Sequence, residues 1–231
     1  MPTPPVVPDP TTSEFDFTRW MTPEALAAYS VAVRRRTFAA GANLYLEGEP
    51  GAEMYRIVRG SVRLSVMGPE GRQATFLLFG AGAAFGVSSL IDGGPRPQTA
   101  QALTEVDVEI LDSAAFGRLR MASRAFDDAL LRLIAQQMRV VSGFYAQAQL
   151  ADLRERVVRR IRETMRTFGA ADDEGTRLSL RLSQSDLAAL VGSSRQSVGK
   201  ILQALQAEGL IRIEYGNILV LSPEKLASDR R

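Results

Sequence analysis

Three side chains with hydrogen-bonding ends lie within six residues of one another, at Arg195, Gln196 and Lys200. Arg and Lys can donate to O6 and N7 of guanine, and the carboxamide of Gln can bond N6 and N7 of adenine. No acidic residue follows them until Glu208, so an anionic surface would meet little repulsion there. The chemistry that this segment favours is recognition of base edges in a DNA groove.

A short amphipathic helix would present these side chains. Ser193 or Ser194 can cap its start, and Gly199 would let it lie deep in a groove. About ten residues earlier in the chain, Ser183 and Asp186 can form a capping box that begins another helix, and Gly192 can end that helix. Apolar residues recur at helical spacing in both segments. They are Leu187, Leu190 and Val191 in the first, and Val198, Ile201, Leu202 and Leu205 in the second.

Two strand patterns follow, at residues 210–215 and 218–221, around the hairpin signal Gly216-Asn217. Two helices, a Gly turn and a hairpin in this order predict a winged helix-turn-helix. The alternative is an ordinary pair of packed helices whose polar face is merely solvated.

The chain of 231 residues contains no Cys and no His. This composition removes disulfides, thiolate ligands, Cys nucleophiles and the commonest metal ligand and base. We therefore expect no haem, iron–sulfur or zinc cofactor. There is also no Walker or Rossmann glycine pattern and no placed carboxylate pair, so we expect no enzymatic activity.

No apolar run reaches the roughly 18 residues needed to span a bilayer, and the N-terminus lacks signal-peptide order. These features predict a cytoplasmic protein with no membrane partner. The formal net charge of +2 is too small to indicate a nucleic-acid partner by itself. Six arginines between residues 154 and 166 could either face phosphates or solvate a helix. They are Arg154, Arg156, Arg159, Arg160, Arg162 and Arg166.

The rest of the chain divides by pattern. Residues 1–13 are rich in Pro and predict a disordered tail. Thr22 can cap a helix that continues to Val33. From residue 37 to residue 111, short apolar runs between Gly-containing turns predict the strands of a small barrel or roll. The runs cover residues 44–46, 54–58, 62–66, 74–79 and 106–111.

A helical pattern covers residues 125–149, and its apolar residues lie near a heptad repeat. They are Phe126, Leu130, Leu133, Ile134, Val140, Val141, Phe144 and Ala148, with Gln137 among them. A stripe of this length favours packing against a second copy of the chain, and hence a homodimer. The alternative is that the helix packs only on its own barrel. A dimer would present two recognition helices about one DNA turn apart, to a pseudo-palindromic site.

Between about residue 37 and residue 221 the chain resembles the CRP/FNR family of bacterial transcription regulators. The similar motifs are Phe38-x-x-Gly-x-x-Leu-Tyr-x-x-Gly-Glu with Met54-Tyr-x-Ile-Val-x-Gly-x-Val-Arg-Leu64, then Phe85-Gly86 with Thr99-Ala100, and finally residues 192–202. The resemblance implies an α+β protein with a cyclic-nucleotide-binding-type β-roll at residues 14–121, a dimerisation helix at 122–150 and a winged helix-turn-helix at 151–231. It implies double-stranded DNA and RNA polymerase as partners.

By the same resemblance, Arg195, Gln196 and Lys200 would contact bases, and Ser183, Ser194 and Ser197 would hold phosphates. Where the cyclic-AMP receptor protein has Glu, this chain has Gln196, which favours adenine over cytosine. We therefore expect a different half-site.

The implied effector site departs further. Cyclic-AMP-binding members have a Glu that accepts from the ribose and an Arg that holds the phosphate, where this chain has Val87 and Gln98. Loss of both bonds removes roughly 1.5–3 kcal/mol each, which disfavours cyclic AMP. Arg96, two residues before Gln98, could replace the missing phosphate clamp.

Phe144 and Tyr145 occupy the helix positions that face the adenine in the cyclic-AMP receptor protein. A site of this kind favours an apolar or aromatic organic effector. The other residues expected in it are Phe85, Gly86, Val87, Ser88, Ser89, Arg96, Gln98 and Thr99. Three alternatives stay open: a regulator that needs no ligand, one that responds to a nucleotide, and a regulatory module that acts through protein contacts.

Overall fold

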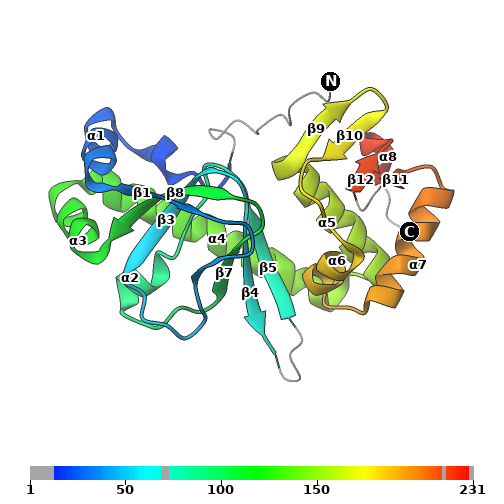
Figure 1. The fold of residues 1–231 in the computed structure, drawn as a ribbon, viewed down its shortest axis with the longest axis horizontal. Coiled ribbons are helices and arrows are strands. Elements are labelled where there is room, and N and C mark those ends of the chain that lie inside the picture. The colour runs from blue at the N-terminus through cyan, green and yellow to red at the C-terminus, as the bar shows by residue number, and fades with distance from the viewer. Residues whose placement is uncertain (1–12, 69–72, 215–216, 229–231) are drawn as a thin grey trace. The chain divides into compact units, whose positions relative to one another are not determined.

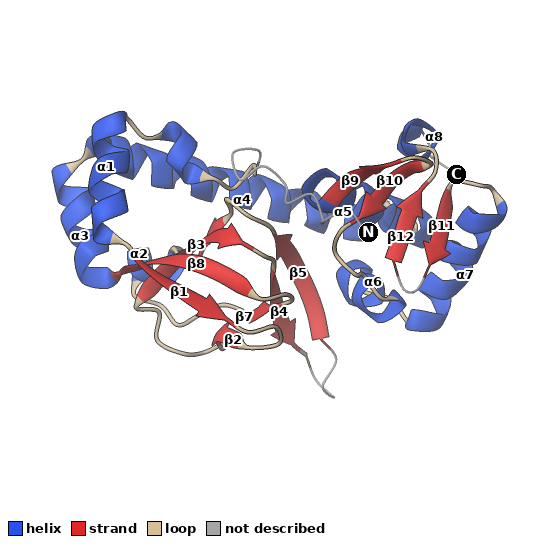
Figure 2. Ribbon diagram, turned by 45° about the horizontal axis from the view of Figure 1, so that its top comes forward, coloured by secondary structure: helices blue, strands red, loops and turns tan. Residues whose placement is uncertain are grey.

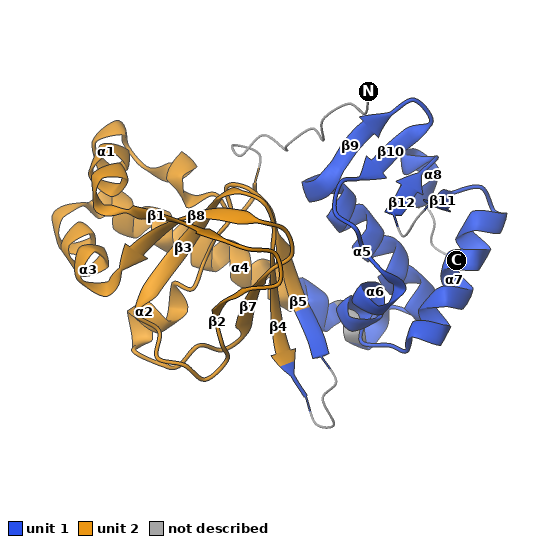
Figure 3. Cartoon of the chain, viewed as in Figure 1, with its two compact units in different colours: residues 1–8, 67–75, 143–231 blue, residues 9–66, 76–142 orange. Residues whose placement is uncertain are grey.

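The computed structural model describes residues 13–68, 73–214 and 217–228, which belong to two compact units (Figures 1 and 3). Among the described residues, the β-roll unit comprises residues 13–66 and 76–142, and the C-terminal unit comprises residues 67–68, 73–75, 143–214 and 217–228. Residues 1–12 of the predicted tail lie outside the described residues, as do parts of the turns predicted at 68–71 and 216–217.

Antiparallel strands dominate the β-roll unit, in two four-stranded sheets (Figure 2). The first sheet has the order β1-β8-β3-β6 and the second the order β2-β7-β4-β5. The strands are β1 (Arg34–Phe38), β2 (Asn43–Tyr45), β3 (Glu53–Arg59), β4 (Val62–Met67), β5 (Gln73–Phe79), β6 (Ala84–Phe85), β7 (Thr99–Ala102) and β8 (Val106–Asp112). Each of the five predicted strand patterns overlaps one of them, whereas β1, β6 and β7 were not predicted.

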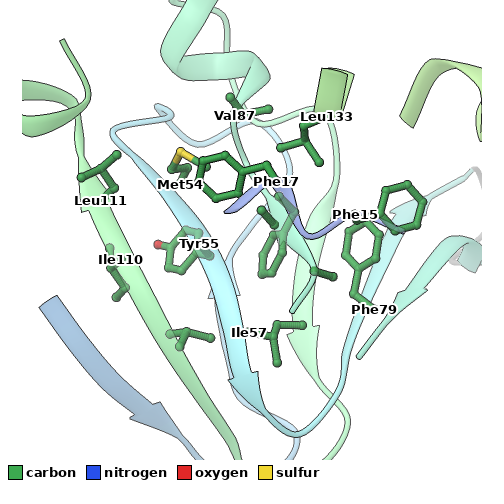
Figure 4. Close-up of a cluster of buried hydrophobic side chains, with 14 of the residues drawn as sticks. Phe15, Phe17, Met54, Tyr55, Ile57, Phe79, Val87, Ile110, Leu111 and Leu133 are labelled. Atoms are coloured by element: carbon green, nitrogen blue, oxygen red, sulfur yellow. The ribbon is translucent and has the colours of Figure 1, made fainter. Parts of the chain in front are cut away.

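Apolar side chains from both sheets form one core (Figure 4). Ile57 and Val108 of the first sheet are fully buried, as is Val62 of the second. The segment before the first helix also enters this core. Phe17 begins a 3₁₀ helix (Phe17–Trp20) and is fully buried against Tyr29 and Phe126.

Helices flank the roll. They are α1 (Pro23–Ala32), α2 (Ser88–Asp92), α3 (Ser113–Ala122) and the first part of α4 (Arg124–Leu150). The Thr22 side chain caps α1 by accepting from the amide of Ala25 at 3.3 Å, as the sequence predicted. The last turns of α4, from Gly143, belong to the C-terminal unit.

The sequence predicted that the apolar stripe of α4 packs against a partner copy of the chain. This prediction is wrong for three of its residues. Phe126, Leu130 and Leu133 are buried in the core of their own β-roll unit. Val141 of the predicted stripe is exposed, with 43% of its surface accessible, and so are three residues outside that stripe: Leu131 (61%), Met138 (68%) and Tyr145 (70%). Leu131, Met138 and Tyr145 are seven residues apart, so they share one face of the helix.

The C-terminal unit contains α5 (Leu153–Phe168), β9 (Gly169–Asp172), β10 (Gly175–Leu178), α6 (Gln184–Val191), α7 (Arg195–Ala207), β11 (Ile211–Glu214), β12 (Asn217–Val220) and α8 (Pro223–Ser228). Its sheet has the order β11-β12-β10-β9. The predicted hairpin is present as β11 and β12, and a second hairpin, β9–β10, extends it. The architecture confirms the predicted α+β fold class, with a β-rich N-terminal unit, a long helix and a C-terminal helix-turn-helix.

Candidate nucleic-acid interface and effector site

Local hydrogen bonds define the helix-turn-helix. The Ser183 hydroxyl accepts from the amide of Asp186 at 3.1 Å, and the Asp186 carboxylate accepts from the amide of Ser183 at 3.0 Å. This capping box begins α6. Gly192 ends it in the left-handed conformation, with φ 64° and ψ 44°. Ser194 then caps α7 by accepting from the amide of Ser197 at 3.1 Å.

The outer side of α7 is available to a ligand. Val198, Leu202 and Leu205 are buried, so the helix turns its other side outward. Arg195, Gln196 and Lys200 are exposed on that side. Within the described residues, no hydrogen bond or ion pair engages the side chain of any of the three.

Gly199 has a role inside the protein. A Cβ atom at this position would lie 3.3 Å from Oε1 of Gln184, so the small residue allows α6 to lie close to α7. The sequence suggested instead that it allows a deep approach to DNA. Gln184 was not singled out from the sequence, and only the packing of the two helices brings it beside Gly199.

Several arginines of α5 bind acidic side chains of the same unit. Arg154 donates to both carboxylate oxygens of Glu208, at 3.0 and 2.6 Å. Arg159 and Arg160 donate to Glu163 at 3.0 and 2.9 Å. These pairs favour a structural role over phosphate contact for the arginines that form them.

The predicted effector residues of the β-roll gather around Gly86. Phe85 is buried, and its ring stacks on those of Tyr55 and Phe79 at centroid distances of 5.5 and 5.7 Å. Val87 is buried and precedes α2. Ser88 is exposed, whereas the buried Ser89 donates to the carbonyl of Pro95 at 3.2 Å.

Arg96, four residues after the end of α2, contacts this loop. It is 3% exposed, and its guanidinium lies 4.2 Å from the centroid of the Tyr45 ring. Nη1 donates to the carbonyl of Gly86 at 2.8 Å, and Nη2 donates to the carbonyl of Glu53 at 2.5 Å. Within the described residues, Nε has no hydrogen-bond partner. Burial raises the pKa of Tyr45, and the Arg96 cation partly offsets that effect.

The remaining candidates divide between the units. Gln98 is half-buried, and the Thr99 hydroxyl accepts from the amide of Glu47 at 3.0 Å. Phe144 and Tyr145 belong to the C-terminal unit. Phe144 is half-buried beneath the guanidinium of Arg160, whose carbon lies 3.6 Å from the ring centroid, and Tyr145 is exposed. A pocket that includes them stays a prediction.

Two further properties limit the chemistry. Among the described residues, no group of three or more His, Cys, Asp or Glu side chains could hold a metal ion. In the same part of the chain, no helix is both long enough and apolar enough to cross a membrane.

A β-roll followed by a winged helix-turn-helix is the architecture of a DNA-binding transcription regulator.

Comparisons with known proteins agree with this class. The cyclic nucleotide-binding domain family matches residues 35–123, and the Crp-like helix-turn-helix domain family matches residues 155–228. A CRP-like cAMP-activated global transcriptional regulator from Mycobacterium tuberculosis is 32% identical over 210 residues, which cover 90% of this chain and 93% of the relative. The transcriptional regulator LdrP from Thermus thermophilus is 33% identical over 187 residues, 80% of this chain and 91% of that protein.

A solved structure shares the architecture at useful identity. It is a transcriptional regulator of the CRP family from Thermus thermophilus, with a TM-score of 0.71 and 30% identity. The match covers 84% of this chain and 97% of that one. The chain belongs to the CRP/FNR family of transcription regulators, as its motifs predicted, and its relatives are regulators rather than enzymes.

Proposed function

We propose that this chain is a homodimeric regulator that binds a specific pseudo-palindromic DNA site through α7. The observation that supports this most directly is the exposure of Arg195, Gln196 and Lys200 on one side of a helix whose other side is buried. Their donors and acceptors match base edges in the major groove. Ser183, Ser194 and Ser197, at the starts of α6 and α7, would bind phosphates, because helix N-termini favour anions.

A second copy of the chain is the proposed occupant of the exposed stripe on α4. Leu131, Met138 and Tyr145 recur every seven residues and are each more than half exposed. Apolar side chains with this spacing pack well against a second helix in a coiled coil. Two copies joined in this way would present two α7 helices to successive major grooves. The bound dimer would have RNA polymerase as a further partner in the bacterial cytoplasm.

The proposed effector is a small organic molecule other than cAMP. The Mycobacterium tuberculosis relative is named as cAMP-activated. This chain has Val87 and Gln98 where cAMP-binding members place a carboxylate and a guanidinium, and Val87 is buried. Neither side chain can provide a charged hydrogen bond to a ribose or a phosphate. Phe85, Gly86, Ser88, Ser89 and Thr99 complete the proposed β-roll part of the site.

A regulator that needs no effector is the second candidate. The observation that favours it is the position of Arg96, whose buried guanidinium donates to the backbone carbonyls of Gly86 and Glu53. In this alternative Arg96 itself would stabilise the Gly86 loop, with no need for an effector.

Selection of bound fragments from a random pool of duplex DNA tests the main proposal. We expect a symmetric motif, with two half-sites separated by about one helical turn. Titration of the selected site at fixed salt, with and without candidate aromatic effectors and cAMP, then tests whether an effector controls DNA binding. An affinity that rises only with an organic effector supports the first candidate, and full affinity without any effector supports the second. If no duplex is enriched over scrambled DNA, in the presence of cAMP or of any candidate organic effector, the proposed DNA recognition is contradicted.

A further inference from the structure

Arg160 contacts three helices of the C-terminal unit. Its guanidinium carbon lies 3.6 Å from the centroid of the Phe144 ring, in the last turns of α4. Its Nε donates to the carbonyl of Leu190, near the end of α6, at 3.3 Å. Its Nη1 donates to Glu163, on its own helix α5, at 2.9 Å. The side chain is only 14% exposed.

Each contact uses a different property of the guanidinium group. Its planar face lies over an aromatic ring, where a cation is attracted to the π electrons. Its donors lie in that plane and diverge, so they reach a carbonyl on one helix and a carboxylate on another. A Lys side chain has no planar face, and its three donors all lie on one nitrogen, so it could not make the three contacts together.

The carbonyl of Leu190 has a special place in the helix-turn-helix. It is one of the last four carbonyls of α6, which have no amide partner within their helix. Gly192 ends the helix two residues later, and Ser194 begins α7. Arg160 therefore binds the end of α6 immediately before the turn that sets the direction of the recognition helix.

We propose that Arg160 is a positioning residue that holds the α6–α7 pair in a fixed orientation on the last turns of α4, and that it is not a phosphate contact. Burial of the guanidinium supports this role, because a side chain that binds DNA phosphates needs to reach the surface. The consequence for DNA binding rests on the proposed function, whereas the contact itself does not. A displacement of Phe144 would be transmitted through the Arg160 side chain to the end of α6.

The test uses the full chain and five variants. Arg160→Gln removes the guanidinium, and Arg160→Lys keeps the charge without the planar group. Phe144→Leu removes the aromatic face but keeps an apolar side chain, and a double variant joins Arg160→Gln to Phe144→Leu. Arg159→Gln is the matched control, because Arg159 lies on the same helix and bonds the same Glu163 but is 52% exposed.

Hydrogen exchange of the backbone amides of α6 and α7 in the free protein is the first measurement. We expect exchange to accelerate about tenfold or more in both Arg160 variants, since each loses hydrogen bonds to a charged group. Arg159→Gln should leave the rates within about twofold, as is usual for exposed ion pairs. Equal rates in the parent protein and Arg160→Gln would overturn the proposal. If Arg160→Gln shows no cooperative thermal unfolding, Phe144→Leu decides the same question.

Affinity for a DNA site selected by the parent protein is the second measurement. We expect Arg160→Gln to weaken it about tenfold or more, with an unchanged salt dependence, and the double variant to be no weaker than about twice that. A salt slope reduced by about one, with equal loss on non-specific DNA, would identify a phosphate contact and overturn the proposal. If the parent protein selects no site, the proposed function fails, and the exchange rates alone then decide the role of Arg160.

Discussion

Nη1 of Arg96 donates a 2.8 Å hydrogen bond to the carbonyl of Gly86, and this bond joins the segment before β7 to the end of β6. The same guanidinium bonds the carbonyl of Glu53 and lies over the ring of Tyr45. An anionic effector that recruited Arg96 would have to replace these bonds with equivalent ones. A clamp function that drew the guanidinium away would therefore break its bonds to Gly86 and Glu53, whereas Nε has no partner among the described residues.

Replacement of Gly86 by Ala should be more destabilising than replacement of Gly41. Both residues have positive φ, 79° and 84°, so an Ala side chain is strained at either position. At Gly41 nothing lies within 4 Å of an added Cβ, whereas at Gly86 the Cβ would lie 2.8 Å from Nη1 of Arg96 and 3.2 Å from the carbonyl of Glu53. We expect Gly41→Ala to cost about 1 kcal/mol and Gly86→Ala about 1–3 kcal/mol more. Urea unfolding of both variants measures the difference, and equal losses would contradict the contact.

Stability should fall steeply at alkaline pH. Burial raises the pKa of Tyr29, Tyr45 and Tyr55 well above the ordinary value near 10. The folded state thus keeps these phenols protonated, while the unfolded chain releases their protons at about pH 10. The free energy of unfolding is therefore undiminished below about pH 10 and decreases above it, by up to about 1.4 kcal/mol per pH unit for each tyrosine.

Urea midpoints measured across this pH range, together with tyrosinate absorbance, test that expectation. Tyr45→Phe should reduce the steepness of the decrease, since one titrating group is removed. Appearance of the full tyrosinate signal while the chain is still folded would show that the expected pKa shifts are absent.

Gln196→Glu should change which base the recognition helix prefers. A carboxylate only accepts hydrogen bonds, so it favours N4 of cytosine, whereas the carboxamide can both donate and accept at adenine. We expect the selected half-site to change at one position, with a discrimination of about 1–3 kcal/mol. Gln203→Glu, seven residues further along the same exposed side of α7, is the control and should change the preference less. An unchanged motif in Gln196→Glu would remove this residue from the base contacts.

Met138→Arg should prevent association of two copies of the chain. Met138 is 68% exposed in the middle of the α4 stripe, where a second helix would bury it. A buried, unpaired Arg costs several kcal/mol in each copy, which is enough to dissociate a dimer at micromolar concentration. Met121→Arg is the control, because Met121 is 93% exposed on α3. Sedimentation velocity measures the mass of both variants, and a Met138→Arg dimer would contradict the proposed interface.

The helix-turn-helix could be predicted from the sequence because its signals are local. Ser183 and Ser194 cap helices through amides three residues away, and Gly192 adopts its left-handed conformation between them. Such interactions depend on neighbours in the chain, so spacing alone reveals them. The same holds for α1, which begins at the cap Thr22.

Strands that depend on distant partners could not be predicted in the same way. β1 contains Arg34, Arg35 and Arg36, and no alternation of apolar and polar residues marks it. It is a strand because it pairs with β8, more than 60 residues later. β9 is similar, since its Gly-Ala-Ala-Asp sequence has little intrinsic preference for a strand and pairing with β10 stabilises it.

By itself the sequence determined the fold class, the family and the helix that carries Arg195, Gln196 and Lys200. Only the tertiary structure decided which apolar stripe of α4 enters the core and which stays exposed, because two stripes share one helix and periodicity cannot rank them. It also decided that the guanidinium groups of Arg96 and Arg160 lie inside the protein. Burial of a charged side chain depends on partners such as Glu53 and Leu190, which are 43 and 30 residues away and can be found only when the chain is folded.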